Sequence, residues 1–312
     1  MDSLVNVVVP VFGIILTGYF AGRLKLLGPD SAAALNRFIF YFALPPALFI
    51  FTARAPVEKI FNWPFIGAFV GGSLLTLLIA LVVGRLLLRQ DVATLAISGF
   101  TAVQANVVFM GLPLLLTAYG PSGALPTIIA ALCLTILFIC GTIAILEVTR
   151  ASGSWTFRIV AQLLTTVLSN PAVISPLLGI LFAMTGLPLP KAVSNYLDLM
   201  AAAVGPAALF SLGLSLVDRK VMGDAREVIW LSTLKLVANP ILTFVLVTYV
   251  FAMDAMWSKT AVILSAMPSG ANAYVIAQQY NVRVEIVSSA VVVSTGLSVI
   301  TISLALVWLG VG

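Results

Sequence analysis

The chain has 312 residues, of which 61% are hydrophobic and only 9% charged, and its mean hydropathy is +1.16. These proportions exclude an ordinary water-soluble surface and indicate a membrane protein with many spans. The formal net charge is +5. Because the Lys and Arg residues fall mainly in short connections between apolar runs, we interpret them as topology signals and expect no nucleic-acid partner.

Ten apolar stretches are long enough to cross a hydrocarbon core of about 30 Å. The N-terminus lacks a basic leader, so we interpret the first stretch as a retained span. The stretches cover residues 4–22, 34–53, 63–88, 92–118, 123–147, 164–185, 194–217, 228–252, 258–281 and 285–310. We therefore predict an all-α polytopic membrane protein with ten transmembrane helices.

Landmarks recur in the two halves of the chain in the same order, which indicates an internal repeat. The matching pairs are Pro10–Ile14 with Pro176–Ile180, Pro46–Phe49 with Pro206–Phe210, and Ala105-Asn106 with Ala271-Asn272, at offsets of 160 to 166 residues. The widest polar gap, residues 149–158, separates a first repeat (1–150) from a second (155–312). Five spans is an odd number, so we expect the repeats to be inverted about an axis in the membrane plane.

The fourth and ninth spans each contain a cluster of helix breakers beside an amide side chain. The breakers are Gly111 and Pro113 in the fourth span, and Pro268 and Gly270 in the ninth. Hydrocarbon cannot satisfy freed backbone groups, so broken helix is tolerated only where it lines a protein cavity or meets a ligand. We predict that the two breaks cross near the membrane midplane and form a binding site.

Five polar side chains are candidates for substrate binding at this crossing. Asn106 and Asn272 can donate to a carboxylate, brace freed carbonyls, or do both. Gln104 and Gln278 can line the same cavity, although bonding between helices would also explain them. Lys235, inside the eighth span, can contact substrate or the carbonyl ends at the crossing, or extend to the interface. The positive dipole end of each second half-helix favours an anion.

Charge and motif counts narrow the function further. Histidine is absent, and Cys133 and Cys140 lie seven residues apart on one expected helix, about 10 Å apart along its axis and too far for a disulfide. We therefore expect no enzyme, metal or cofactor. No Asp or Glu lies in the middle of the fourth or ninth span, which disfavours sodium/proton antiport and leaves coupling to either ion unassigned.

The Lys and Arg residues also predict the orientation. One expected side carries Arg23, Lys25, Arg85, Arg89, Arg150, Arg158, Arg219, Lys220, Arg226 and Arg283, and the other carries Arg54, Lys59, Lys191 and Lys259. Positive charge accumulates on the cytoplasmic side. We therefore expect both termini outside the cytoplasm.

One motif points to another class of protein. Asn170-Pro171-Ala172 matches the aquaporin tripeptide, with Asn239-Pro240-Ile241 as a loose second copy. Aquaporins place such motifs on half-helices of a six-span fold, unlike the ten spans expected here. Helix capping by Asn and a kink at Pro explain both copies better.

The stretches Asn106–Leu114 and Met267–Tyr274, together with the ten-span layout, resemble the auxin efflux carrier family over the whole chain. This family includes the plant PIN carriers and bacterial malonate-type carriers, and it shares a bile acid/sodium symporter-like inverted-repeat fold. The resemblance implies a scaffold of spans 1, 2, 6 and 7 and a mobile core of spans 3, 4, 5, 8, 9 and 10, whose crossing helps bind a carboxylate. The large hydrophilic loop of the long plant carriers is missing.

We therefore predict a secondary active or facilitative carrier of small organic carboxylates, with a malonate-like dicarboxylate favoured, that works by alternating access in a bacterial inner membrane. Aromatic acids such as auxin are the alternative, because Phe100, Phe109 and Tyr274 could form a stacking wall. A non-transporting membrane receptor or sensor is a further alternative. A homodimer through the scaffold is left open.

Overall fold

The computed structural model describes residues 2–151, 157–217 and 222–311, and within these ranges it is helical except for loops and one isolated β-bridge. The first half contains α1 (Asp2–Arg23), α2 (Pro29–Phe38), α3 (Leu44–Ala53), α4 (Val57–Ile60), α5 (Trp63–Leu86), α6 (Val92–Val103), α7 (Leu112–Tyr119), α8 (Ala124–Cys133) and α9 (Cys140–Arg150). The second half contains α10 (Phe157–Leu168), α11 (Pro171–Met184), α12 (Lys191–Ser215), α13 (Ala225–Thr233), α14 (Asn239–Tyr249), α15 (Ala255–Ser265), α16 (Ala271–Tyr280) and α17 (Val284–Trp308).

Several of these helices are joined by short segments of different pitch, so that one span consists of two helices. Four of these segments are π-helices. η1 (Ile39–Ala43) joins α2 to α3, and η2 (Val107–Gly111) leads into α7. η4 (Leu134–Ile139) joins α8 to α9, and η5 (Leu234–Ala238) joins α13 to α14. Between α7 and α8, the 3₁₀ segment η3 (Gly120–Gly123) begins at Gly120 with φ 60°. A Cβ on Gly123 would lie 2.4 Å from the carbonyl oxygen of Leu115, so the chain turns tightly there.

The structure confirms an all-α membrane protein. Among the described residues, seven helical stretches are long and apolar enough to cross a membrane, or eight if α10 and α11, which meet at 64°, form one span. This count is below ten because α6, α15 and α16 have only 10 to 12 residues each and because residues 107–150 count as one run of 44. The ten-span layout stays a prediction.

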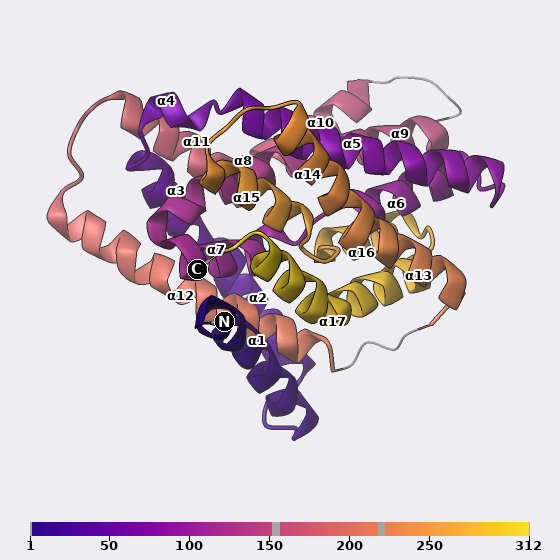
Figure 1. Ribbon diagram of the computed structural model, residues 1–312, viewed down its shortest axis with the longest axis horizontal. Helices are drawn as coiled ribbons and strands as arrows, with labels where there is room; N and C mark the ends of the chain where they lie inside the picture. The colour runs from indigo at the N-terminus through magenta and orange to yellow at the C-terminus, as the bar shows by residue number, and fades with distance from the viewer. Residues whose placement is uncertain (1, 152–156, 218–221, 312) are drawn as a thin grey trace.

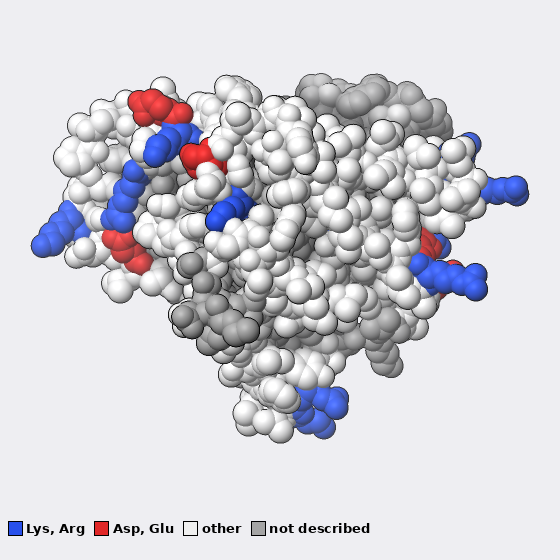
Figure 2. All heavy atoms as spheres, in the orientation of Figure 1, with Lys and Arg blue, Asp and Glu red and all other residues white. Residues whose placement is uncertain are grey.

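The charged side chains fit a membrane-embedded molecule. On the face drawn in Figure 2 they gather toward the left part and the right and lower margins, and the broad middle carries none. Large apolar side chains such as Leu78, Leu181 and Ile300 are exposed, as expected for surfaces that face lipid. Arg219, Lys220 and the side chain of Arg158, which entered the orientation prediction, lie outside the described residues.

Two helix pairs approach so closely that their backbones touch. α1 packs along α12, where a Cβ on Gly213 would lie 1.8 Å from the carbonyl oxygen of Ile15. α3 packs along α11, where a Cβ on Gly179 would lie 2.5 Å from the carbonyl oxygen of Phe49. Such contacts between small residues hold helices together in lipid, where the hydrophobic effect does not drive association. Figure 1 shows α1 and α12 crossing in the lower part of the view.

Polar contacts tie α12 to the helices α2 and α3. The Arg54 guanidinium donates two hydrogen bonds of 2.7 Å to the Asp198 carboxylate and a third to Ser194. The Ser211 hydroxyl donates to the side-chain oxygen of Asn36 at 2.8 Å. Asp198 therefore forms an ion pair near one end of α12, and it does not lie at the crossing.

The glycine contact predicts a matched pair of substitutions. We expect Gly213→Ala to destabilise the protein by about 1–3 kcal/mol, because the Ile15 backbone cannot move away from the added methyl group. Gly13→Ala is the control, since nothing lies within 4 Å of the Cβ built there. Thermal unfolding of the two purified variants measures the difference, and equal midpoints would contradict the close approach.

Candidate functional site at the crossing of two broken helices

The two predicted breaks meet in the structure. After α6 ends at Val103 and α15 ends at Ser265, the two strands of backbone pair antiparallel at Ala105 and Ser269. The backbone N–H of Asn106 donates to the carbonyl oxygen of Pro268 (2.9 Å), and that of Gly270 donates to the carbonyl oxygen of Gln104 (2.8 Å). Each break therefore satisfies backbone groups that the other one exposes.

The break in the first half falls earlier than its proline. Residues 104–106 are non-helical, whereas Gly111 closes η2 and Pro113 follows in the first turn of α7. Since η2 runs directly into α7, Pro113 lies inside a continuous helical run and its missing N–H removes one bond of that run. A Cβ on Gly111 would lie 2.9 Å from the side chain of Leu264, and one on Gly270 would lie 3.4 Å from the carbonyl oxygen of Ala105. Both glycines thus lie at the contact, and Pro113 lies beyond it.

Two further freed carbonyls are held by groups other than the two asparagines. The Ser269 hydroxyl donates to the carbonyl oxygen of Thr101 (3.0 Å), and its N–H donates to Ser294 Oγ (3.1 Å). The Lys235 ammonium donates to the carbonyl oxygen of Ser265 at 2.5 Å. Sequence reasoning missed Ser269, because its partner Thr101 is distant along the chain.

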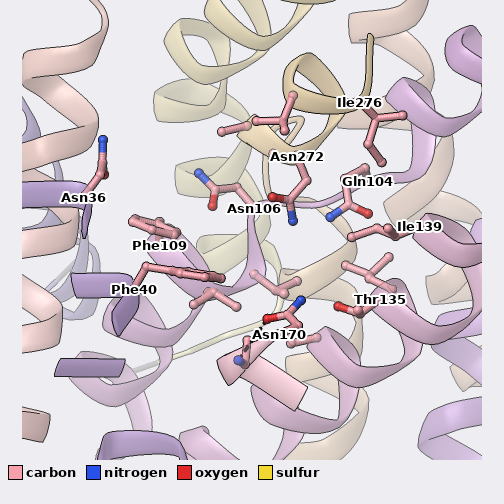
Figure 3. A pocket seen from close by; sticks show the side chains of 18 of the residues that line it. Asn36, Phe40, Gln104, Asn106, Phe109, Thr135, Ile139, Asn170, Asn272 and Ile276 are labelled. Atoms are coloured by element: carbon pink, nitrogen blue, oxygen red, sulfur yellow. Dashed lines mark hydrogen bonds between the residues drawn. The ribbon is translucent and has the colours of Figure 1, made fainter. Parts of the chain in front are cut away.

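A cavity of about 590 Å³ opens beside the crossing. Its polar lining comprises Asn36, Arg37, Tyr41, Gln104, Asn106, Thr135, Gln162, Thr166, Asn170, Ser215, Asn272 and Gln279. Figure 3 shows the side chains of Gln104, Asn106 and Asn272 converging from the crossing, with Asn170 below them. The structure therefore brings together three of the five predicted binding residues.

The side chains of these three amides are available to a ligand. Asn106 and Asn272 form no side-chain hydrogen bond with the residues that the structure describes, and Gln104 is 4% exposed with its Oε1 unpaired. Bracing of the crossing by Asn106 or Asn272 is therefore not seen. An unpaired amide beside a cavity of this size is a group that a bound molecule or water can satisfy.

The other two predicted binding residues do not line the cavity. Gln278 is exposed on α16, and its neighbour Gln279 lines the cavity instead, because adjacent residues on a helix point about 100° apart. Lys235 is completely buried and contacts the carbonyl end of α15. A contact with the carbonyl ends at the crossing was one of the alternatives to substrate binding expected for this residue. Of the three aromatic residues expected in a stacking wall, only Phe109 lines the cavity.

Arg37 on α2 is the one charged side chain among the described lining residues. It is exposed and forms no hydrogen bond or ion pair with the described part of the chain. It lies nine residues into the helical run 29–53, which is long enough to span a membrane. Sequence reasoning missed Arg37, although a charge inside an apolar run marks a functional position in its own right.

Asn170 lies at the bend between α10 and α11 and lines the cavity. It accepts a hydrogen bond from the N–H of Ala172 (3.0 Å) and caps α11 as predicted. Asn239, the residue of the loose second copy, forms no such cap. It is buried, and neither side-chain atom has a partner among the described residues.

The dipole of α16 completes the electrostatics of the site. Gly270, Ala271 and Asn272 all line the cavity, so the N-terminal end of this ten-residue helix faces it. The unpaired N–H groups of such an end carry partial positive charge. With Arg37 in the lining and no acidic side chain among the described lining residues, the cavity is suited to an anion.

A polytopic helical protein whose two broken helices meet beside a polar cavity belongs to the class of membrane transporters. Residues 3–306 match the family model described as "Membrane transport protein". The chain therefore belongs to this family, which is the auxin efflux carrier family that its motifs resemble.

Three relatives illustrate the range of the family. The chain is 30% identical to a Rhizobium meliloti protein named "Putative malonate transporter" (97% of this chain, 95% of the relative). It is 27% identical to the Escherichia coli transporter YfdV (91% of each) and 23% identical to auxin efflux carrier component 8 of Arabidopsis thaliana (92% of each). The family and these relatives are transporters, so the chain is an integral membrane transporter and not an enzyme.

The bond from Ser269 to the Thr101 carbonyl predicts a stability change. We expect Ser269→Ala to lower the free energy of unfolding by about 1–3 kcal/mol, because it leaves a buried carbonyl unpaired. Ser303→Ala is the control, since Ser303 is half-buried and its hydroxyl bonds only within its own helix. Chemical unfolding in detergent measures both, and a loss no larger than that of the control would contradict the assigned role.

Proposed function

We propose that this chain carries small organic carboxylates across the membrane by alternating access, with a malonate-like dicarboxylate favoured. The observation that carries the proposal is the lining of the cavity: free amides of Asn106 and Asn272 and the positive end of α16 on one side, and the unpaired cation of Arg37 on another. Amide N–H groups, a helix N-terminus and a guanidinium are all donors that recognise carboxylates.

The arrangement at the crossing supports ten spans in two inverted repeats, residues 1–150 and 155–312. Ala105 and Ser269 are 164 residues apart, and at the same offset the bond from Asn106 to Pro268 corresponds to the bond from Gly270 to Gln104. At this offset Asn106 corresponds to Gly270, so its match with Asn272 in the sequence is out by two residues. The pairing of α1 with α12 and of α3 with α11 fits the same relation.

The position of the cavity supports the division into scaffold and core. Its lining comes from α2, η1, α10, α11 and α12, which belong to the proposed scaffold, and from α8, η4, α9, α16 and the crossing in the proposed core. A substrate that binds between two bodies changes its access when one body moves against the other. The scaffold would also supply the surface for a homodimer.

The orientation proposal and the cavity agree. Ser215 and Gln279 line the cavity and lie at those ends of α12 and α16 that adjoin the expected cytoplasmic side. We infer a bacterial inner-membrane protein with both termini outside the cytoplasm and the cavity on the cytoplasmic side. Coupling to protons or sodium is a separate question.

A dicarboxylate is favoured by the two separate groups of donors, since each can hold one carboxylate. The relative named for malonate transport, at 30% identity over nearly the whole chain, points the same way. Aromatic acids are the second candidate, because Phe40, Tyr41 and Phe109 line the cavity and could stack on a ring. The relative named as an auxin efflux carrier, at 23% identity, fits this candidate.

The first test is uptake of labelled carboxylates into proteoliposomes. We expect saturable transport of a short dicarboxylate and a loss of about tenfold or more in Asn106→Ala and Asn272→Ala, because each variant removes a donor to the carboxylate. Asn195→Ala, on an exposed position of α12 outside the cavity lining, is the control. Absence of transport of any acid by folded wild-type protein would sink the proposal.

Arg37 provides a test of substrate class. We expect Arg37→Gln to weaken dicarboxylate transport by about tenfold or more and monocarboxylate transport far less, because only the longer anion needs the second charge. Arg89→Gln is the control, since Arg89 is exposed and lies outside the cavity lining. An equal loss for both substrate classes would show that Arg37 does not select the dicarboxylate.

A further inference from the structure

Asn170 is an amide of the cavity lining that lies on the proposed scaffold, whereas Asn106 and Asn272 lie at the crossing. It precedes α11, and its side-chain oxygen accepts a hydrogen bond from the backbone N–H of Ala172 at 3.0 Å. This bond is an ordinary helix cap. Because the cap uses only the oxygen, the two amide N–H donors of Asn170 remain for another partner.

The cap also determines which end of the Asn170 side chain faces the cavity. A backbone N–H can only donate, so its partner on Asn170 must be the amide oxygen, and the nitrogen must point elsewhere. Figure 3 shows this nitrogen directed into the cavity, toward the amides of the crossing. Asn170 therefore presents hydrogen-bond donors to whatever occupies the cavity.

The other asparagines of the lining are less constrained. Asn106 and Asn272 form no side-chain hydrogen bond within the described part of the chain. Asn36 accepts a hydrogen bond from the hydroxyl of Ser211 at 2.8 Å, and a hydroxyl can either donate or accept. Each of these three amides can therefore turn its oxygen or its nitrogen toward a ligand, whereas Asn170 can offer only donors. A group that offers only donors selects an acceptor such as a carboxylate oxygen.

We propose that Asn170 is a specificity-determining residue of the carrier: its helix cap holds it so that its amide N–H binds a carboxylate oxygen of the substrate from the scaffold side. This inference rests on the proposed transport of carboxylates. The two ends of one side chain then have separate tasks, because the oxygen stabilises the start of α11 and the nitrogen recognises the anion.

The substitution Asn170→Asp separates these two tasks. An aspartate caps a helix about as well as an asparagine does, but its ionised carboxylate is an acceptor only. We expect the thermal midpoint to stay within about 2 °C of the wild type and malonate uptake into proteoliposomes to fall about tenfold or more. Asn62→Asp is the matched control. Asn62 is also half-buried, caps α5 by accepting from the N–H of Phe65 (3.0 Å), and lies outside the cavity lining.

A change of selectivity distinguishes contact with the substrate from a structural effect. The monoamide of malonate carries an N–H donor that the new carboxylate can accept. We expect the ratio of malonate uptake to monoamide uptake to fall about tenfold or more in Asn170→Asp and to stay unchanged in Asn62→Asp. If Asn170→Asp does not fold, Asn170→Ser replaces it, because serine also caps helices but lacks the amide donor. The ratio should again fall, since a donor bonds more strongly to a carboxylate than to a neutral amide.

The possible results separate this inference from the carrier function. A fall in the uptake ratio in the Asn170 variant alone supports the inference. Unchanged malonate uptake in that variant, or equal losses for malonate and its monoamide, overturns the role of Asn170 and leaves the carrier function standing. Absence of uptake of any carboxylate by folded wild-type protein overturns the proposed function, and this inference with it.

Discussion

The two reciprocal backbone hydrogen bonds between residues 104–106 and 268–270 are the interaction on which the rest of the structure depends. A helix interrupted in hydrocarbon exposes donors and acceptors that lipid cannot satisfy, at a cost of several kcal/mol for each group. Here the groups exposed by one break are the partners of the other. Neither break is stable by itself, so the crossing forms as a unit and fixes the positions of four half-helices.

This self-sufficient crossing explains why amide side chains beside it are free. Backbone groups pair with each other, Ser269 holds the Thr101 carbonyl, and Lys235 holds the Ser265 carbonyl. Asn106 and Asn272 are therefore not needed to brace the helix ends, and their donors can face the cavity. The positive N-terminal end of α16 lies at the cavity, whereas the negative C-terminal end of α15 lies next to the buried Lys235.

The features predictable from sequence are those with a local cause. Gly, Pro and Asn inside apolar runs have few structural explanations, which is why the sequence located both breaks and the amides beside them, Gln104, Asn106 and Asn272, whose role in binding stays a prediction. The position of a side chain around a helix was not predictable to one residue, so Gln278 was chosen and Gln279 lines the cavity. Ser269 was missed for a different reason: its partner Thr101 lies far away in the chain, and no spacing rule links the two residues. Arg37 could have been found, because it is a charged residue inside an apolar run.

The partial charges and the full positive charge that line the cavity lie on different parts of the proposed carrier. The proposed core offers the substrate only partial charges, from amides and a helix end, whereas the full charge of Arg37 lies on the proposed scaffold. In the proposed mechanism, an anion held by partial charges would keep these contacts when the core moves and would lose the contact with Arg37. Binding would then be strongest when the cavity has the shape seen here and would weaken as the core moves away. That difference would allow release on the other side without any change in the core itself.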